Sequence, residues 1–179
     1  MSSHPKRNVL SVSWSMLRHA EWELLIGVTE SGLYWIGANG ESLEDCRNRQ
    51  PSMFVNTEWK RNDEMVAPYA AEIAQYLSGE RRAFTLRHDL RGTLFQQAVW
   101  KALLDIPYGT SVSYSDIAQM ISKPSAARAV GAAIGANPVL ITVPCHRVVG
   151  KNGTLTGYRG GLEMKTRLLE LEHEAVAAR

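Results

Sequence analysis

The chain has 179 residues, 45% of them hydrophobic and 21% charged, with a formal net charge of +2. This composition supports a packed core and excludes a disordered chain, a collagen and a disulfide scaffold. No apolar run approaches the roughly 18 residues that a membrane helix needs, and no apolar segment follows Lys6 and Arg7. We therefore expect neither a membrane span nor a signal peptide. Cys46 and Cys145 are far apart in the sequence, which favours free thiols and a cytoplasmic location.

The first third of the chain is predicted to contain a small antiparallel sheet. Two apolar runs, 22–28 and 33–36, flank a glycine-containing turn, and this pattern is typical of a β-hairpin. Residues 38–62 are polar and interrupted by glycine and proline, which predicts a loop or weak structure. The sheet therefore needs a helix to cover its apolar face.

The residues that follow predict that helix and a domain boundary. Asp63 can cap a helix whose apolar positions recur at helical spacing, although Pro68 favours a later start. Gly79 ends the helix, and residues 81–92 have the composition of a connector. We therefore predict an N-terminal sheet and helix domain at 1–90 and a C-terminal domain at 91–179.

The C-terminal half is predicted to be mainly helical, which gives an α+β protein overall. Thr93-x-x-Gln96 and Ser113-x-x-Asp116 are capping boxes, and Pro107-Tyr108-Gly109 is a turn between the two helices that they open. Residues 126–136 form a helix of mostly small side chains that Asn137-Pro138 stops. Two short helices around a tight turn predict a helix-turn-helix. A buried apolar run at 139–143 and a last helix that contains Leu162, Leu168, Leu169 and Leu171 complete this half.

The small-residue helix can lie close to DNA. Ala126 and Ala127 leave no bulk at its start, Arg128 is its one long cation, and Lys123 lies in the turn before it. A slim backbone with one cation fits insertion into a groove, while tight packing between helices uses the same small residues. The charge distribution agrees with the first interpretation. Residues 91–161 hold seven Lys or Arg and two acids, whereas residues 1–90 hold ten and twelve.

The sharpest chemical feature is the adjacent pair Cys145 and His146, followed by Arg147. A thiolate is a strong nucleophile, but a free thiol with a pKa near 8.5 needs a base or a positive environment to ionise at neutral pH. Neighbouring side chains point apart, so His146 can act through a water, and an acid should orient its ring. By residue type alone, the candidate acids are Asp116, Glu163, Glu170 and Glu172. The alternative is a buried structural cysteine beside a surface histidine.

Six motifs in order resemble one family, the O6-alkylguanine-DNA alkyltransferases. The similarity is dense from about residue 91 to 173, and general over the first 90 residues. The motifs are Gly92-Thr93-x-Phe95-Gln96-x-x-Val99-Trp100, Ile106-Pro107-x-Gly109-Thr110, Ser113-Tyr114, Arg128-Ala129-Val130-Gly131, Pro144-Cys145-His146-Arg147-Val148 and Tyr158-x-Gly160-Gly161.

The resemblance implies a catalytic set. Cys145 takes the alkyl group from O6 of guanine or O4 of thymine in duplex DNA and keeps it. His146 deprotonates Cys145 through a water, and Glu172 orients His146. Asn137 ties the turn after the recognition helix to the same network. The thioether does not revert, so each molecule acts once, without a cofactor.

The resemblance also implies how the lesion is bound. Tyr114 supports rotation of the damaged nucleotide out of the duplex and donates to the flipped base, while Arg128 fills the gap in the stack from the minor groove. Tyr158 and Arg159 belong to the loop that closes the pocket. The main chain of Cys145 and Val148 reads the guanine edge.

The sequence departs from the family pattern at two places. The residue before the acid in the last helix is usually His and is Leu171 here, which leaves Glu170 as a rival to Glu172. Arg159 stands where a small polar residue is common. We expect no metal site, since the histidines and Cys46 lack ligand spacing, and we expect a monomer without an obligate protein partner.

Three other functions remain as alternatives to alkyl transfer. They are a DNA lesion-binding protein of alkyltransferase-like type, which lacks the cysteine, a helix-turn-helix transcription factor, and a thiol hydrolase that turns over repeatedly.

Overall fold

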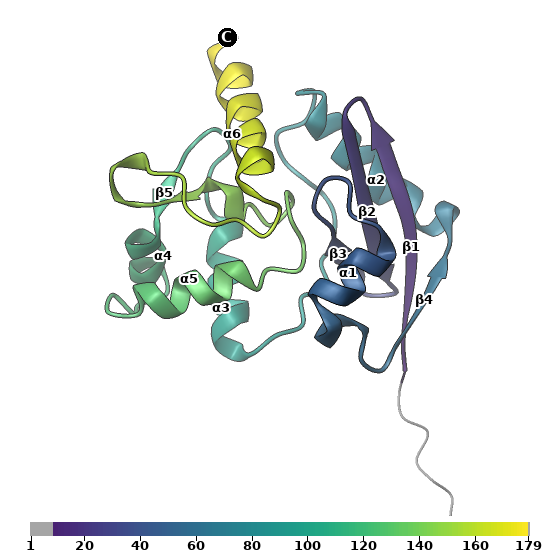
Figure 1. The fold of residues 1–179 in the computed structure, drawn as a ribbon. Helices are drawn as coiled ribbons and strands as arrows, with labels where there is room; N and C mark the ends of the chain where they lie inside the picture. The colour runs from purple at the N-terminus through teal and green to yellow at the C-terminus, as the bar shows by residue number, and fades with distance from the viewer. Residues whose placement is uncertain (1–8, 179) are drawn as a thin grey trace, which may run out of the picture.

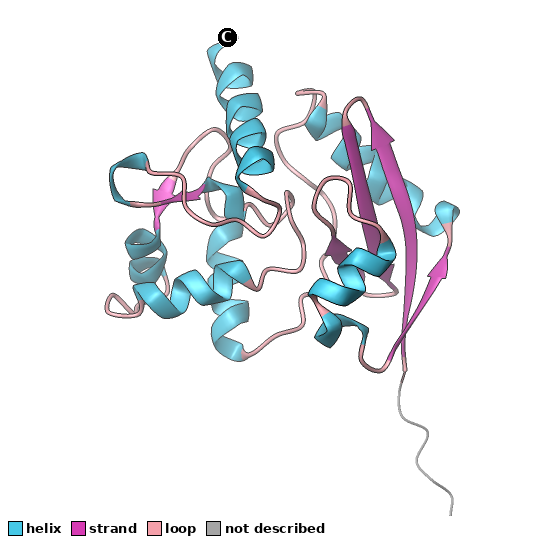
Figure 2. Ribbon diagram, viewed as in Figure 1, coloured by secondary structure: helices cyan, strands magenta, loops and turns pink. Residues whose placement is uncertain are grey.

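Residues 9–178 are described by a computed structural model, which has an α+β fold (Figure 1). A sheet with helices on its two faces forms one side of the molecule, and a group of helices forms the other (Figure 2). The last helix, α6 (Leu162–Ala177), stands beside the upper end of the sheet in this view. None of the described helices is both long and apolar enough to cross a membrane.

The sheet has four strands in the order β3-β2-β1-β4. The strands are β1 (Leu10–His19), β2 (Trp22–Thr29), β3 (Gly32–Ile36) and β4 (Thr57–Arg61). The predicted hairpin is confirmed as β2 and β3, and β1 adds to it antiparallel. We expected an antiparallel sheet. The sheet is mixed instead, because β4 pairs with β1 in parallel.

The interpretation of residues 38–62 as loop or weak structure was wrong. This segment holds α1 (Leu43–Arg49), the short 3-10 helix Pro51–Phe54 and strand β4. A capping box of Ser42 and Asp45 opens α1. The strand pairs with a segment more than forty residues earlier, so its stability comes from a partner that local sequence does not show.

The helix α2 (Asp63–Leu77) starts earlier than Pro68 suggested. Asn62, not Asp63, is its N-cap and accepts from the Met65 amide, and the helix continues through Pro68. Pro68 is the sixth residue of the helix and has no amide hydrogen, so α2 forms without the bond that this residue would otherwise donate to the Glu64 carbonyl. As predicted, the helix ends before Gly79, whose φ of +76° suits glycine.

The C-terminal half follows its local signals closely. Both capping boxes are confirmed, at the starts of α3 (Leu94–Leu104) and α4 (Tyr114–Met120). The small-residue helix is α5 (Ala127–Gly135), and α4 and α5 form the predicted helix-turn-helix. Two short parallel strands, β5 (Val112–Ser113) and β6 (Val148–Val149), connect this unit to the cysteine segment.

One hydrophobic core runs through both halves of the chain. It joins Leu24 and Ile26 of the sheet and Ile73 of α2 to Trp100 of α3 and Val139 after α5. A second, smaller cluster lies on the opposite face of the sheet, under α1. Because the larger core is shared, the two halves hold each other in place. The boundary at residue 90 stays a prediction.

Candidate active site

The turn after α5 and the cysteine segment are held together by one side chain, Asn137. Its Nδ2 donates to the Cys145 Sγ at 3.1 Å and to the Val143 carbonyl at 3.1 Å, and its Oδ1 accepts from the Val139 amide at 3.0 Å. Asn137 is fully buried, and Cys145 is 2% exposed in a single 3-10 turn, Cys145–Arg147. The amide thus presents a hydrogen-bond donor to the sulfur, which favours a developing thiolate.

The His146 ring lies against a carboxylate from the last helix. Its Nε2 is 2.9 Å from the Glu172 Oε1, and both side chains are buried. The other ring nitrogen, Nδ1, is also buried and has no hydrogen-bond partner among residues 9–178. An ionised carboxylate only accepts, so Nε2 carries the proton and Nδ1 keeps a lone pair. The ring is therefore arranged as a base.

Glu172, and not Glu170, is the residue that reaches the histidine. Glu172 is fully buried, whereas Glu170 is exposed on the outer face of α6. Burial favours the neutral form of the Glu172 carboxyl, but its hydrogen bonds to His146 and Arg147 outweigh that and lower its pKa to about 2. The carboxylate is thus ionised at any physiological pH.

Arg147 compensates the charge of Glu172, and the sequence analysis did not select it. Its Nη2 and Nε contact the carboxylate at 2.8 to 3.1 Å, and its Nη1 donates to the Ile106 carbonyl at 2.7 Å. The Gly109 amide also donates to Glu172 Oε2, at 2.8 Å. The buried negative charge of Glu172 is stabilised only because these donors are held in place around it. The position of Arg147 beside His146 was the signal available in the sequence.

Burial sets both reacting groups in their neutral forms. It raises the pKa of the Cys145 thiol, although the Asn137 hydrogen bond and the charges of Arg159 and Lys165 oppose that. It lowers the pKa of His146, against the effect of Glu172. A neutral thiol beside a neutral imidazole can react only if the proton moves as the sulfur attacks.

A hollow of about 380 Å³ lies beside the recognition helix α5. Tyr114 and Tyr158 line it together with Gly131 and Gly157. The Tyr114 hydroxyl is 2.7 Å from the Thr156 Oγ1, which links the start of α4 to the 150–161 loop. The Tyr158 hydroxyl is buried without a partner. Burial raises the pKa of the Tyr158 phenol well above its usual value, and negative charge on Cys145 raises it further.

Arg159 lines the same hollow, but its guanidinium is engaged elsewhere. It donates to the carbonyls of Asn137 at 2.9 Å, Pro138 at 3.1 Å and Ile36 at 2.6 Å, and it stacks on the Trp35 ring with a centroid distance of 4.3 Å. The side chain of this predicted pocket-loop residue ties the loop to strand β3. A pocket contact at this position can come only from its backbone.

The Val148 carbonyl, expected to read the guanine edge, accepts from the Lys165 Nζ at 2.6 Å. Lys165 also donates to the Thr156 carbonyl at 3.1 Å and is 1% exposed. The sequence analysis missed it. Its signal was the spacing of Lys165 and Glu172, which lie two turns apart on the buried face of α6 with Leu168 and Leu169.

The predicted DNA-binding residues lie at the helix-turn-helix. Arg128 and Lys123 are exposed, and Ala126 and Ala127 are half-buried at the start of α5. Two of the seven cations counted at residues 91–161 are not on the DNA-facing surface. Arg147 is bonded to Glu172, and Arg159 is bonded to main-chain carbonyls. The exposed cations of this half that remain apart from carboxylates are Lys101, Lys123, Arg128 and Lys151.

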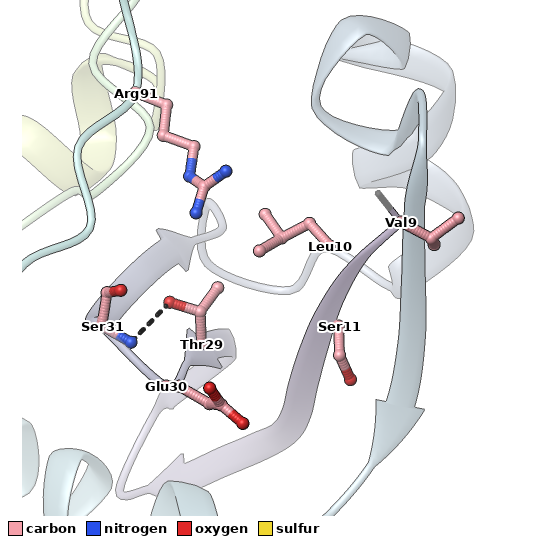
Figure 3. Close-up of a pocket in the computed structure, with 7 residues that line it drawn as sticks. All are labelled: Val9, Leu10, Ser11, Thr29, Glu30, Ser31 and Arg91. Atoms are coloured by element: carbon pink, nitrogen blue, oxygen red, sulfur yellow. Dashed lines mark hydrogen bonds between the residues drawn. The ribbon is translucent and has the colours of Figure 1, made fainter. Parts of the chain in front are cut away.

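One further hollow lies away from the predicted site residues. A hollow of about 420 Å³ lies at the end of the sheet, between the start of β1, the β2–β3 turn and Arg91 (Figure 3). Arg91 is paired there with Asp89. Over residues 9–178, His, Cys, Asp and Glu side chains form no group of three that could hold a metal ion.

The fold and the site define a helix-turn-helix protein with a buried cysteine beside a histidine and carboxylate pair. Residues 94–174 match the family model of the 6-O-methylguanine DNA methyltransferase DNA-binding domain. The inducible methylated-DNA–protein-cysteine methyltransferase of Bacillus subtilis is 53% identical over 168 residues, which are 94% of each chain. The chain belongs to the family of methylated-DNA–protein-cysteine methyltransferases.

Solved structures agree over nearly the whole chain. The O6-methylguanine methyltransferase of Mycobacterium tuberculosis superimposes with a TM-score of 0.78 at 40% identity, covering 92% of this chain and 94% of that one. The Mycobacterium tuberculosis OGT in complex with DNA gives 0.76 at 39% identity, covering 93% and 94%. The similarity therefore includes the N-terminal half as well as the DNA-binding domain.

Proposed function

We propose that the protein repairs alkylated DNA by moving the alkyl group from O6 of guanine, or O4 of thymine, to Cys145. The observation that carries this proposal is the set of contacts at the sulfur. Asn137 donates to Sγ, and the adjacent His146 keeps Nδ1 free while Glu172 holds Nε2. Family membership supplies the substrate class, since the relatives are methyltransferases that act on methylated DNA.

The reaction is one displacement at the alkyl carbon. The Cys145 sulfur forms a bond to that carbon as the bond from carbon to O6 breaks, and the electron pair of the broken bond stays on guanine. The thiol proton passes to His146, directly or through a water, and Glu172 stabilises the imidazolium. The guanine takes a proton from the Tyr114 hydroxyl, which restores the unmodified base. The tyrosinate then regains a proton from solvent as the His146 imidazolium releases its own, so no net charge is left behind. The thioether is stable, so one molecule repairs one lesion.

The lesion must leave the duplex before it can react. Cys145 is 2% exposed, and an O6 lesion is inside the base stack, so the nucleotide has to be extruded into the hollow beside α5. Exposed Arg128 on the slim helix takes the place of the extruded base, with contacts from the minor groove. Lys123 and the first residues of α5 contact the sugar-phosphate backbone of the DNA. Tyr158 closes the pocket from the 150–161 loop.

A lesion-binding protein without chemistry is the alternative, and the cysteine argues against it. Such a protein needs the helix-turn-helix and the pocket, but no sulfur and no base. Here the donor to the sulfur, the histidine and its carboxylate are all buried and fixed, at a cost in desolvation that binding alone does not require. We also place the protein in the cytoplasm as a monomer, since Cys46 and Cys145 are both free thiols.

The decisive experiment measures equivalents and mass. The protein is mixed with a tenfold excess of duplex DNA that contains O6-methylguanine, and repaired DNA and protein mass are followed together. We expect one equivalent repaired and one methyl group added, which peptide mapping locates at Cys145. Many equivalents would mean a hydrolase, and none would mean a binding protein or a transcription factor.

A further inference from the structure

Helix α2 carries one residue of the N-terminal half into the candidate active site. The Tyr76 hydroxyl is 2.5 Å from the Glu172 Oε1 and 3.2 Å from the His146 Nε2, and its side chain is fully buried. Tyr76 was not selected from the sequence, although it lies one turn beyond Ile73 on the buried face of α2. A buried tyrosine needs a partner for its hydroxyl, and here the partners are the predicted acid and base.

The donor and acceptor roles of the three groups are fixed by chemistry. Glu172 is ionised and can only accept, so the Tyr76 O–H donates to it. The Tyr76 oxygen keeps a lone pair that faces Nε2 of His146, which then meets two acceptors, the phenol and the carboxylate. Both favour a proton on Nε2, and that leaves Nδ1 as the basic nitrogen.

We propose that Tyr76 is a positioning residue for alkyl transfer, which holds Glu172 and the His146 ring so that Nδ1 stays available to Cys145. This inference rests on the proposed function. Among the described residues, the Tyr76 hydroxyl bonds to His146 and Glu172 and not to the Cys145 sulfur, so it acts through the two residues it contacts. It also gives the N-terminal half a part in the chemistry, because α2 is packed against β1 and β2.

Two observations separate this role from packing. The charge of Glu172 is already compensated by Arg147, so the phenol is not needed to neutralise it. The neighbouring Tyr108 ring meets Tyr76 edge to face, at a centroid distance of 5.9 Å, yet its own buried hydroxyl has no partner. The same cluster thus tolerates an unbonded hydroxyl, whereas Tyr76 makes two contacts with the site.

The test compares Tyr76→Phe with Tyr108→Phe, since each removes one buried hydroxyl from the same cluster. The free base O6-benzylguanine and a methylated duplex serve as substrates. For Tyr76→Phe we expect the limiting rate to fall about 10-fold on both, as the loss of one hydrogen bond to a charged group predicts. The concentration that gives half of the limiting rate, and the DNA affinity, should stay unchanged. Tyr108→Phe should react like the parent.

A double variant tests whether Tyr76 acts through Glu172. If it does, Tyr76→Phe combined with Glu172→Gln should be no slower than Glu172→Gln alone. Ring nitrogen shifts of His146 in the ¹⁵N-labelled parent, assigned against His146→Ala, should show the proton on Nε2. This measurement needs no Tyr76 variant to fold.

Three results would overturn the inference. They are parent-like limiting rates in Tyr76→Phe, additive losses in the double variant, and a proton on Nδ1 in the parent. Failure of the proposed function is distinct, because the parent protein itself would then transfer no alkyl group to Cys145.

Discussion

The two cysteines have the same burial and opposite surroundings. Cys46, on α1, lies with its Sγ 3.6 Å from the Glu41 carboxylate. Burial and that negative charge raise the pKa of Cys46 to about 11. Cys145 is equally buried, but its sulfur accepts from the Asn137 amide, and the Arg159 charge opposes the effect of burial on its pKa. Neither thiol is exposed, so accessibility does not separate them.

The difference teaches that a nucleophile is defined by what stabilises its ionised form and what can take its proton. At Cys46 the sulfur faces the Glu41 carboxylate, whose charge works against a thiolate and outweighs the small opposing effect of Arg159 on the pKa. At Cys145 a donor faces the sulfur, and the next residue offers a free ring nitrogen.

The largest effect is expected from removing each thiol in turn. Cys145→Ala should lose alkyl transfer completely, since burial and the Glu41 charge keep the Cys46 thiol protonated, whereas Cys46→Ala should still take one alkyl group per molecule. Mass spectrometry of the intact protein and of its peptides measures both. Methylation mainly at Cys46, or full activity without Cys145, would end the assignment.

The proton acceptor at Cys145 is tested next, with two glutamates one helical half-turn apart. Glu172→Gln should slow transfer roughly 100-fold or more, the range of general acid–base catalysis. It removes the charge that stabilises the imidazolium, and DNA affinity should change little. Glu170→Gln, on the exposed face of α6, is the matched control and should react like the parent. A slow Glu170 variant would mean that the register of α6 is wrong.

Access to Cys145 from DNA should depend on Arg128, which has no counterpart at Cys46. Arg128→Ala should repair duplex DNA about 5- to 150-fold more slowly, because nothing then offsets the unstacking of the extruded base. It should react with free O6-benzylguanine as the parent does, since that base has no stack to leave. Lys60→Ala, on β4, controls for the loss of one surface cation. Equal losses on both substrates would mean that Arg128 does not act by insertion into the DNA groove.

Acid should lower the free energy of unfolding, because it protonates the Glu172 carboxylate beside His146. The pKa of Glu172 is about 2 in the folded protein and 4.5 in an unpaired glutamate, so the unfolded chain binds the proton first. The ionised carboxylate therefore stabilises the fold above pH 4.5, and this contribution of about 3 kcal/mol is lost as the pH falls towards 2. Urea unfolding of the parent and of Glu172→Gln should give curves that converge over this range. A constant difference would contradict the assignment.

Alkali should also lower the free energy of unfolding, because it ionises the Cys46 thiol. The pKa of this group is raised by folding, whereas the pKa of Glu172 is lowered. The Cys46 thiol ionises near pH 9 in an unfolded chain and near 11 in the fold. The contribution is complete below pH 9 and is lost as the pH rises to 11, at most about 2 to 3 kcal/mol. Compared with Cys46→Ala, the parent should lose stability over this window. The Ala variant cancels the titration of other groups, and parallel curves would mean that neither burial nor Glu41 raises the pKa of Cys46.

Local sequence determined most of the C-terminal half. The capping boxes at Thr93 and Ser113 place α3 and α4, and the run of small residues after Lys123 predicts α5. These signals act within a few residues, so they survive without knowledge of the fold. The motif around Cys145 likewise predicts a nucleophile and a base, because the two are adjacent in the chain.

Only the tertiary structure decided which distant groups meet. The parallel strand β4, the choice of Glu172 over Glu170 and the contact of Tyr76 with His146 each join segments tens of residues apart. The guanidinium of Arg159 likewise bonds to the Ile36 carbonyl of β3, although the residue lines the hollow. Sequence patterns show which face of an element is buried, but not what it is buried against. The partner is set when the shared core brings the sheet, α2 and α6 together.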